Sequence, residues 1–571
     1  MSYAGQSGAT EPDSITGRKS LAGLMVFLFI AAAWSSAPFF RPGVLDGERF
    51  VFHDNSYALF TADQLLAGKL LFRDVFYQYG VLTAYLHAGW AALFGNTIFA
   101  YWHLAQFLTC LGIVELWLLL RRNQRTWPAL VFGTIILFPY FLVPGGLAGG
   151  VGASVYVALE RICLLSIALA WRPPATRSFG SALSIGLLLG AMQWVKFGGA
   201  FVAGVSLLLS DVLILSYAPE EKKGWLHWLT ISSLTLLGFL LIEGSLIVLA
   251  YVSLPAQLAS EILWPSWMVQ NYEAYRYKSV PLWHWFNFNY FVGVQMPMVA
   301  AGVASLVFIG HLLVRRKAGP EERSRRVSWA GPPLLFLIFF VLALIIYLPH
   351  MWVTMPYVWL ILLPAAFFLQ NAPRFCQGIF LVCCFPAFLL SVKGVLYPQR
   401  VGQLRKVHLA NDTLCLPPET ADRLANLHRI LDLLERERED HSPGLPAILG
   451  FPIGSGFHHF LGYPAATRHA WFMPGFIQPR EEDAFLKSLD RTLAVIVFFP
   501  DRSQPDPPSP DPSSWEFFSV PLFSRSTCLA FASRLKAPIK VDSHCWVFPV
   551  RVTEGRNVFY NEHCVALPFS G

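Results

Sequence analysis

The stretch that decides the fold is Gly47-Glu48-Arg49-Phe50-Val51-Phe52-His53-Asp54-Asn55, which follows an apolar segment near residues 21–40. Behind it come Tyr77-Gln78-Tyr79-Gly80 and Ala91-Ala92-Leu93-Phe94-Gly95, beside apolar stretches that are short or interrupted. This arrangement places a carboxylate just past a first membrane span, next to helices that are too short to span the bilayer. It predicts a reaction on a substrate presented at the bilayer surface. The order of these segments favours a membrane-embedded enzyme.

The composition also places the chain in a bilayer. Of its 571 residues, 55% are hydrophobic and only 14% are charged, which is too little polar surface for a soluble globule of this size. The formal net charge is +7, but the basic residues fall mostly in short runs between apolar segments. This pattern is typical of loops on the inner side of a membrane rather than of a nucleic-acid-binding surface.

The apolar segments predict an α-helical polytopic membrane protein with about eleven spans, because each crossing needs about 20 apolar residues. We expect the spans near residues 21–40, 98–120, 127–144, 154–171, 179–195, 198–216, 226–252, 287–314, 331–348, 352–370 and 374–396. Residues 1–20 are polar and precede the first span. We expect that span to stay as an uncleaved anchor, because Pro38 directly follows the small residues Ser35-Ser36-Ala37 and Arg41 comes soon after.

The distribution of basic residues predicts the orientation. If the N-terminus is cytoplasmic, the outer loops before residue 397 contain few basic residues although they are longer in total: Arg41, Arg49, Lys69, Arg73, Arg276 and Lys278. The inner loops contain Arg18, Lys19, Arg121, Arg122, Arg125, Arg172, Arg177, Lys222, Lys223, Arg315, Arg316, Lys317, Arg323, Arg325, Arg326 and Arg374. By the positive-inside rule the N-terminus is cytoplasmic, and an odd number of spans places residues 397–571 outside.

Residues 397–571 are expected to form a small extracytoplasmic α/β domain. Ala421–Glu439 predicts an amphipathic helix, and residues 447–451 and 493–499 predict buried strands. This segment also contains Cys415, Cys528, Cys545 and Cys564. Four cysteines in an oxidising space form two disulfides or stay as four unpaired core thiols, and both alternatives stay open.

The first outer loop, residues 41–97, contains two stretches that predict interfacial helices, Tyr57–Leu71 and Val81–Phe94. Such helices would cover a cavity at the membrane surface. Asp54 stands at the start of the first of them, where a carboxylate is suited to catalysis or, alternatively, to capping the free backbone N–H groups of the helix.

With these motifs the chain resembles the GT-C superfamily of polytopic glycosyltransferases. The resemblance rests on Asp54, on Tyr79-Gly80-Val81-Leu82, on Leu93-Phe94-Gly95, and on the Gly-rich segment with a Lys, Gly190-Ala191-Met192-Gln193-Trp194-Val195-Lys196-Phe197-Gly198-Gly199. In the tail, Thr467-Arg468, Phe472-Met473-Pro474-Gly475-Phe476 and Val495-Ile496-Val497 are similar to bacterial members of the dolichyl-phosphate-mannose-protein mannosyltransferase-like group. Two positions depart from the pattern: Asn55 replaces a second acid and Val81 replaces a Pro. Asp54 is therefore left to act alone.

The resemblance implies inverting transfer of a sugar from a polyprenyl-phosphate donor to a lipid, glycan or protein acceptor at the outer face of the plasma membrane. Such a transfer needs one base, for which Asp54 is the candidate, and fixed cations for the leaving phosphate. Lys196, Arg161 and Arg276 are the candidate phosphate ligands, and Glu160 is a second candidate catalytic residue that would bind sugar hydroxyls. The residues expected to line the substrate are His53, Arg73, Tyr77, Gln78 and Tyr79. No cofactor is expected, and metal dependence is left open.

Each of these assignments has a structural alternative. Lys196 and Arg161 could lie at the membrane interface with their charged ends in water, and Glu160 and Arg161 could form a plain ion pair. His458-His459 with His469 matches no standard zinc spacing. At the level of the whole protein, the alternatives are a multi-pass transporter or lipid flippase and a non-catalytic GT-C-like protein. Transporters usually contain internal repeats, and none is visible in this chain.

Overall fold

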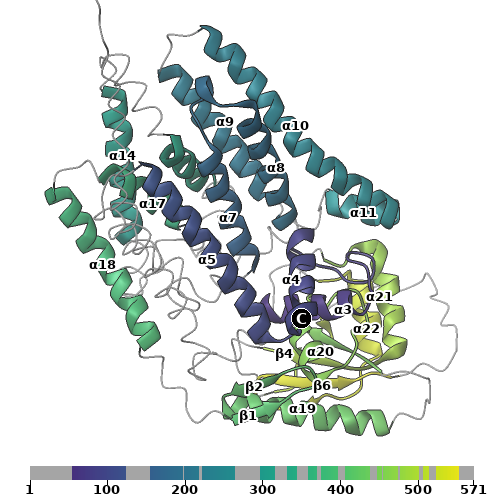
Figure 1. Cartoon of the computed structure of the whole chain (residues 1–571). Helices are drawn as coiled ribbons and strands as arrows, with labels where there is room; N and C mark the ends of the chain where they lie inside the picture. The colour runs from purple at the N-terminus through teal and green to yellow at the C-terminus, as the bar shows by residue number, and fades with distance from the viewer. Residues whose placement is uncertain are drawn as a thin grey trace, which may run out of the picture.

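The computed structural model of the chain is organised as a helical part and a part that contains β-sheets (Figure 1). The structure describes residues 54–123, 155–196, 198–217, 222–263, 296–314, 331–343, 358–369, 374–396, 405–437, 446–452, 454–472, 476–499, 506–512 and 522–551.

The helical part follows the apolar segments of the sequence closely. Its helices are α3 (Asp54–Leu66), α4 (Val81–Phe94), α5 (Ile98–Asn123), α7 (Val155–Ala170), the 3-10 turn η2 (Pro174–Thr176), α8 (Phe179–Val195), α9 (Gly199–Tyr217), α10 (Lys222–Ser253), α11 (Ala256–Leu263), α14 (Met296–Val314), a helix over Gly331–Ala343, α17 (Val358–Leu369) and α18 (Arg374–Leu396). The predicted spans at 21–40 and 127–144 lie outside the described residues, so the number eleven stays a prediction.

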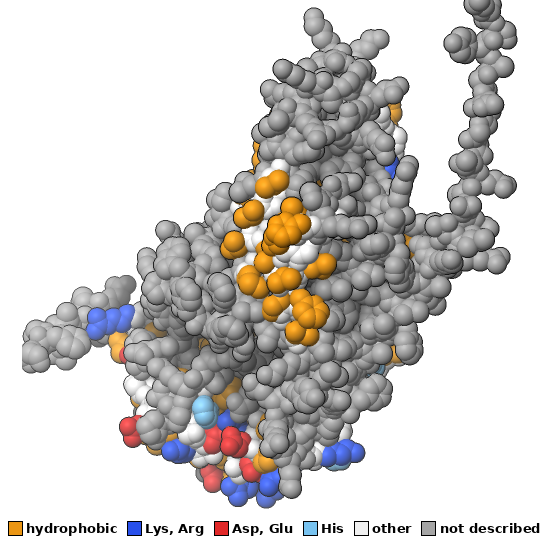
Figure 2. All heavy atoms as spheres, turned by 90° about the vertical axis from the view of Figure 1, so that its left-hand side faces the viewer, with side chains coloured by type: hydrophobic (Ala, Val, Ile, Leu, Met, Phe, Trp, Pro, Cys, Tyr) orange, Lys and Arg blue, Asp and Glu red, His pale blue; other side chains and the backbone are white. Residues whose placement is uncertain are grey.

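The described helices have the character of membrane helices. Three of them are long and apolar enough to cross a bilayer, over Ile98–Leu119, Gly199–Ser216 and Trp225–Ser253, and several others are apolar but shorter. Large apolar side chains are exposed to the surroundings on several of these helices, among them Val252 on α10 (82%) and Phe375 on α18 (77%). Figure 2 shows hydrophobic side chains gathered on one face of the helical part, with most of the visible charged side chains below them at the lower end of the molecule. An apolar surface of this extent is suited to contact with lipid.

Helices α8 and α10 pack closely because glycines face the contact. A Cβ atom on Gly186 would lie 2.0 Å from the carbonyl oxygen of Thr235, and one on Gly238 would lie 2.5 Å from that of Leu183. The Thr235 hydroxyl also donates a hydrogen bond to the carbonyl oxygen of Ala182, at 3.1 Å. Small residues and interhelical hydrogen bonds of this kind hold helices together in lipid, where hydrophobic burial gives little driving force.

The tail contains two sheets. The first is the antiparallel pair β1 (Arg405–His408) and β2 (Thr413–Leu416). The second has the order β3-β4-β6-β5, in which β3 (Ala447–Phe451) and β4 (Thr492–Phe498) are parallel, and β6 (Cys545–Pro549) is antiparallel to β4 and to β5 (Ile539–Lys540). The tail helices are α19 (Pro418–Arg436), α20 (Ser455–Leu461), η6 (Pro479–Glu481), α21 (Glu482–Ser488), η7 (Leu489–Arg491) and α22 (Arg525–Ser533).

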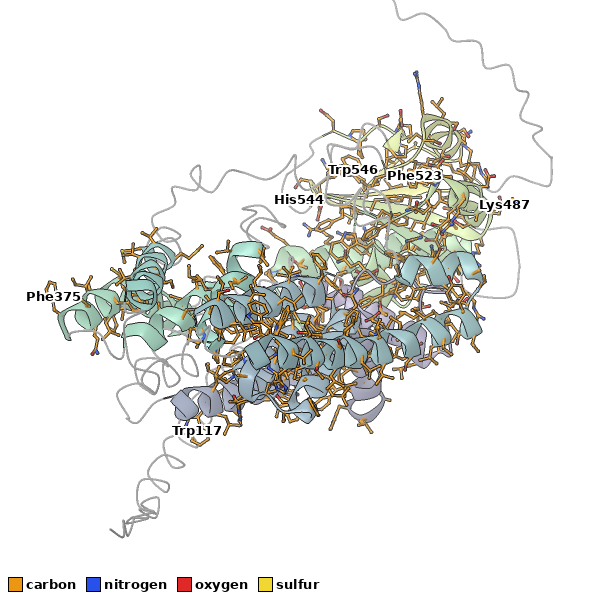
Figure 3. The ribbon with its side chains drawn as sticks, turned by 90° about the horizontal axis from the view of Figure 1, so that it is seen from above. Trp117, Phe375, Lys487, Phe523, His544 and Trp546 are labelled. Carbon is orange, nitrogen blue, oxygen red and sulfur yellow. The ribbon has the colours of Figure 1, made fainter. Side chains whose placement is uncertain are left out.

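The predicted tail elements are present within a few residues of their expected bounds. The helix expected over Ala421–Glu439 is α19, and the two expected strands are β3 and β4. Every residue of both strands is buried, as their continuous apolar runs indicated. Figure 3 separates the two parts of the molecule: Trp117 and Phe375 lie in the helical part, and Phe523, His544 and Trp546 lie in the sheet part. Cys545 carries a buried free thiol, whereas Cys564 lies outside the described residues and nothing is described of the Cys415 side chain.

The first of the two expected interfacial helices differs from its prediction. Helix α3 ends at Leu66 rather than Leu71, because Gly68 adopts a positive φ of 81° and turns the chain. Residues 55–62 are all buried, so α3 does not lie on the surface with one apolar face exposed. The tail packs onto it instead: Ser56 and Ser455 are hydrogen-bonded at 3.0 Å, and His459 contacts Asp63 at 2.6 Å.

Candidate active site

The turn between α8 and α9 presents Lys196. Helix α8 ends at Val195, Lys196 has an extended backbone, and α9 begins at Gly199. Gly198 has a φ of 85°, a conformation that side chains disfavour, so glycine is required there for the chain to reverse direction so tightly. Lys196 thus lies in the short turn between the end of α8 and the start of α9, and both helices fix the position of its backbone.

Lys196 lies beside a buried carboxylate from α7. Its Nζ atom is 3.9 Å from Oε2 of Glu160, whose side chain is 3% exposed, whereas the Lys196 side chain is 22% exposed. The ammonium group also lies 5.8 Å from the ring centre of Tyr156, one helical turn before Glu160. Gly199 leaves room for this carboxylate, because a Cβ atom there would come within 2.9 Å of Oε1. The site is therefore a charged pair with an aromatic ring beside it, and the Lys196 side chain is partly exposed.

The Tyr79-Gly80 motif of the loop between α3 and α4 packs against the same turn. The backbone N–H of Gly80 donates to the carbonyl oxygen of Val195 at 2.9 Å, and the hydroxyl of Thr83 contacts the same oxygen at 3.2 Å. The ring of Tyr79 stacks on that of Tyr156, with centroids 4.0 Å apart and an angle of 16° between the planes. The structure thus brings together the first loop, α7 and the Gly-rich segment, of which the first loop and the Gly-rich segment are joined by a contact that spans 112 residues of sequence.

Aromatic side chains continue from Tyr79 toward the tail. Tyr77 lies 5.4 Å from Tyr79, Tyr57 lies 5.1 Å from Tyr77, and Trp471 of the tail lies edge-on to Tyr57 at 5.3 Å. The Tyr57 hydroxyl donates to the carbonyl oxygen of Phe76 at 2.7 Å and accepts from the N–H of Gln78 at 3.2 Å. These bonds fix the backbone of the loop that carries the predicted lining residues.

Some of the remaining predicted site residues lie on described elements, and the others lie outside the residues that the structure describes. Arg161 follows Glu160 on α7 and is buried. Arg73 is largely exposed and pairs with its neighbour Asp74 at 2.8 Å, an arrangement that lowers the pKa of the Asp74 carboxyl. Asp54 begins α3, and nothing is described of its side chain. His53 and Arg276 lie outside the described residues.

Sequence reasoning overlooked two aromatic residues of this region. Tyr156 could have been found, because it precedes Glu160 by four residues and so shares its face of a helix. Trp471 had no local signal, since its contact with Tyr57 joins segments that are far apart in sequence.

The three tail histidines do not form a metal centre within the described residues, where no group of three or more His, Cys, Asp or Glu side chains is suited to hold a metal ion. His459 contacts Asp63, His458 contacts the carbonyl oxygen of Tyr463 at 3.2 Å, and His469 lies 3.8 Å from Glu481. The ring of His458 also lies 5.2 Å from that of Phe60, and the ring of His469 lies 4.8 Å from that of Phe76, so all three histidines lie at the contact between the tail and the first loop.

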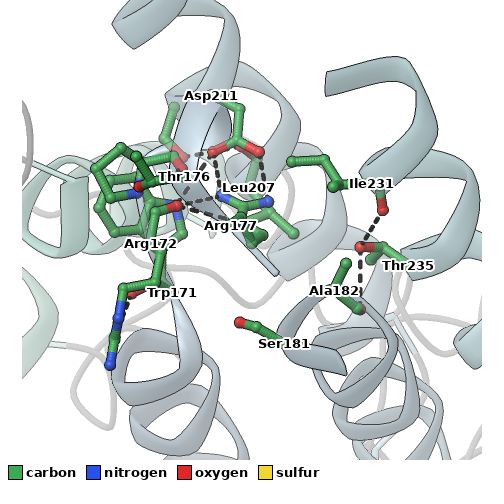
Figure 4. Close-up of polar contacts among 12 residues, drawn as sticks. Trp171, Arg172, Thr176, Arg177, Ser181, Ala182, Leu207, Asp211, Ile231 and Thr235 are labelled. Carbon is green, nitrogen blue, oxygen red and sulfur yellow. Dashed lines mark hydrogen bonds and ion pairs between the residues drawn. The ribbon is translucent and has the colours of Figure 1, made fainter. Parts of the chain in front are cut away.

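A second charged cluster lies at the other end of α8. Arg177 forms two hydrogen bonds with Asp211 of α9, at 2.8 and 2.7 Å, and both side chains are at most 2% exposed. Trp171 donates to the same carboxylate at 3.1 Å (Figure 4). Helix α8 has 17 residues, so about 25 Å separates this cluster from Lys196. Because its charges are fully engaged and buried, we assign this cluster a structural role.

Comparisons with known proteins agree with this fold. No family model and no curated protein matches the sequence. Among solved structures, it is similar to ArnT from Cupriavidus metallidurans bound to undecaprenyl phosphate and to the same protein in the apo state, with TM-scores of 0.51 and 0.50. Identity is 13% in both cases, and the match covers 94% of this chain and 98% of that chain. This likeness shows the fold alone: the chain shares the ArnT fold, and the mannosyltransferase-like group is not distinguished.

Proposed function

We propose that the chain is a membrane glycosyltransferase that transfers a sugar from a polyprenyl-phosphate-linked donor to an acceptor hydroxyl at the outer face of the plasma membrane. The observation that carries this proposal is the meeting of the partly exposed Lys196 side chain, the buried Glu160 carboxylate and the stacked Tyr79 and Tyr156 rings. The similarity to a protein that binds undecaprenyl phosphate supports the choice of donor.

Lys196 is suited to the phosphate of the donor. It lies within three residues of the N-terminus of α9, where free backbone N–H groups and the helix dipole favour an anion. In the proposal Arg161 and Arg276 add further positive charge. These cations stabilise the charge that develops on the phosphate when its bond to the sugar breaks, so that no acid is needed for the leaving group.

Asp54 is the proposed base. Its carboxylate accepts the proton of the acceptor hydroxyl while the hydroxyl oxygen forms a bond to the anomeric carbon from the side opposite the phosphate. The bond between that carbon and the phosphate oxygen breaks, its electron pair leaves with the polyprenyl phosphate, and the configuration is inverted. Asn55 follows Asp54, and a single base is sufficient for this step.

Glu160 is assigned to the sugar. A buried carboxylate is a strong acceptor for sugar hydroxyls, and Lys196 at 3.9 Å compensates its charge. Tyr77, Gln78 and Tyr79, with His53 and Arg73, would line the substrate on the first-loop side. In this proposal residues 397–571 are extracytoplasmic, and the acceptor is a lipid, a glycan or a protein.

Transfer from a panel of radiolabelled polyprenyl-phosphate sugars by the purified chain in liposomes tests the proposal. We expect a product with one donor, and Lys196→Ala should raise the KM for that donor by about tenfold or more. Lys540→Ala is a matched control, because Lys540 also lies over an aromatic ring, 5.3 Å from the centre of Trp546, but in the tail. Movement of the lipid between leaflets without any transfer would instead identify a flippase.

A further inference from the structure

The loop that carries Tyr77 and Tyr79 has an unusual backbone. Between α3 and α4 it closes on itself, because the N–H of Leu70 donates to the Asp74 carboxylate at 2.9 Å and the N–H of Phe72 donates to Val75 at 2.6 Å. Phe72 has a φ of 67°, a left-handed conformation that a bulky aromatic residue rarely adopts. Such a conformation persists only where surrounding contacts hold it.

Arg468 of the tail supplies these contacts. Its guanidinium Nη1 donates to the carbonyl oxygen of Phe72, and its own carbonyl oxygen accepts from the N–H of Phe76 at 2.8 Å. The guanidinium carbon also lies 5.6 Å from the ring centre of Phe76, and the rings of His469 and Phe476 each lie 4.8 Å from the same ring. Arg468 thus contacts both ends of the turn that immediately precedes Tyr77.

Glu481 fixes the orientation of Arg468. The Nε and Nη2 atoms of Arg468 lie 2.9 and 2.6 Å from Oε1 of Glu481, and the other carboxylate oxygen accepts from the N–H of Gln478 at 3.1 Å. Burial alone would raise the pKa of the Glu481 carboxyl, but the interaction with His469, 3.8 Å away, and the charge of Arg468 lower it to about 2. The carboxylate is therefore ionised at neutral pH.

We propose that Arg468, held by Glu481, is a positioning residue that sets the 70–79 loop so that Tyr79 stacks on Tyr156 beside Lys196. The link to the site is short, because Tyr57 is hydrogen-bonded to both Phe76 and Gln78. A guanidinium is needed, since one planar group must reach Glu481 and the Phe72 carbonyl together, and a lysine ammonium lacks this geometry. The effect on sugar transfer rests on the proposed function, whereas the effect on the loop rests on these contacts alone.

Hydrogen exchange measured by mass spectrometry on the full chain tests the effect on the loop. Arg468→Lys and Glu481→Gln should each speed exchange in peptides covering residues 70–80 by about tenfold, while peptides from β4 and β6 keep wild-type protection. Arg534→Lys is the matched control, because Arg534 pairs with Asp490 at 2.5 Å in the same tail without a described contact to the loop. It should leave exchange at 70–80 unchanged.

Transfer assays on the same variants test the consequence for the site. Arg468→Lys should lower kcat/KM by about tenfold, and Arg534→Lys should not. Unchanged exchange at 70–80 in Arg468→Lys would overturn the proposal outright. Faster exchange with unchanged transfer would overturn the positioning role and leave the proposed function standing. If the wild-type chain transfers no sugar from any donor, the proposed function fails, and the exchange data alone decide whether Arg468 holds the loop.

Discussion

The backbone N–H of Gly80 donates to the carbonyl oxygen of Val195 at 2.9 Å, which joins the loop between α3 and α4 to the end of α8. The approach is so close that a Cβ atom on Gly80 would lie 1.8 Å from the carbonyl oxygen of Trp194. This contact positions Tyr79 against Tyr156 and therefore leads to a first prediction.

Gly80→Ala should destabilise the protein by about 3 kcal/mol or more and abolish transfer, because the backbone of either the loop or α8 must move. Thermal unfolding in detergent measures the first effect. Gly89→Ala on α4 is the control: nothing lies within 4 Å of its Cβ position, and alanine favours a helix, so stability should stay or rise slightly. Equal stability of both variants would contradict the close approach.

Asp54→Asn should lower the transfer rate by on the order of 100-fold or more, while the melting temperature stays near that of the wild type. Asparagine cannot accept the proton but caps a helix nearly as well as aspartate, so the two possible roles of Asp54 separate cleanly. Turnover close to the wild type would exclude Asp54 as the base and favour the transporter or non-catalytic alternatives.

Acid should weaken the tail through His458. Burial, with the charge of Lys69, lowers the pKa of this imidazole to about 4, although the hydrogen bond to Tyr463 opposes the shift. Unfolded histidine titrates near 6.5, so the stability is fully present above that pH and is lost as the pH falls toward 4, by up to about 3 kcal/mol. Unfolding measured at pH 7.5 and 4.5 should therefore differ less in His458→Asn than in the wild type.

The exposed His408, which is hydrogen-bonded to Thr413, provides the control for that experiment. His408→Asn should keep the full pH dependence of the wild type. If both substitutions reduce it equally, the titrating group is not His458.

Asp211→Asn should destabilise the helical part by about 3–5 kcal/mol, because the buried guanidinium of Arg177 loses its countercharge. Folded molecules should keep their transfer rate, since the cluster lies far from Lys196. Asp422→Asn removes an exposed partner of Arg405, with both side chains 59% exposed, and should change stability by less than about 1 kcal/mol. Urea or thermal unfolding in detergent compares the two variants.

The orientation of the chain is testable by fusion. Alkaline phosphatase joined after Arg400 should be active, because we expect that residue outside, and a fusion after Arg316 should be inactive. The opposite pattern would place Asp54 on the cytoplasmic side and exclude the proposed site.

Much of the helical part could be predicted because membrane helices are encoded locally. Apolar length and the Lys196 to Gly198 break were enough to place α8 and α9 within a residue of their observed bounds. The resemblance implies that the first loop, Glu160 and Lys196 share one site. The structure places Tyr79, Glu160 and Lys196 around Tyr156, whereas the catalytic role of this cluster stays a prediction.

The contacts between the tail and the first loop could not be predicted. Asp63 and His459 are 396 residues apart, and neither carries a local pattern that specifies the other. The burial of α3 also depends on contacts that are distant in sequence. Its short apolar stretch predicts a surface helix, but in the structure the tail covers it. The sequence marks Thr467-Arg468 only through a resemblance, and the contact of Arg468 with Phe72 depends on the fold.

The distance in sequence between Arg468 and Phe72 also sets an order of events during synthesis. The two residues are 396 positions apart, and at about 5–20 residues per second the ribosome needs roughly 20–80 s to make the chain between them. For that time the nascent first loop is without the arginine that holds its left-handed turn, although the helices around it have already been made. The loop that contains Tyr79 can therefore gain its contacts with Arg468 only after the tail has been made. A chain that ends before residue 468 would contain the helical part but lack the arginine that holds this loop.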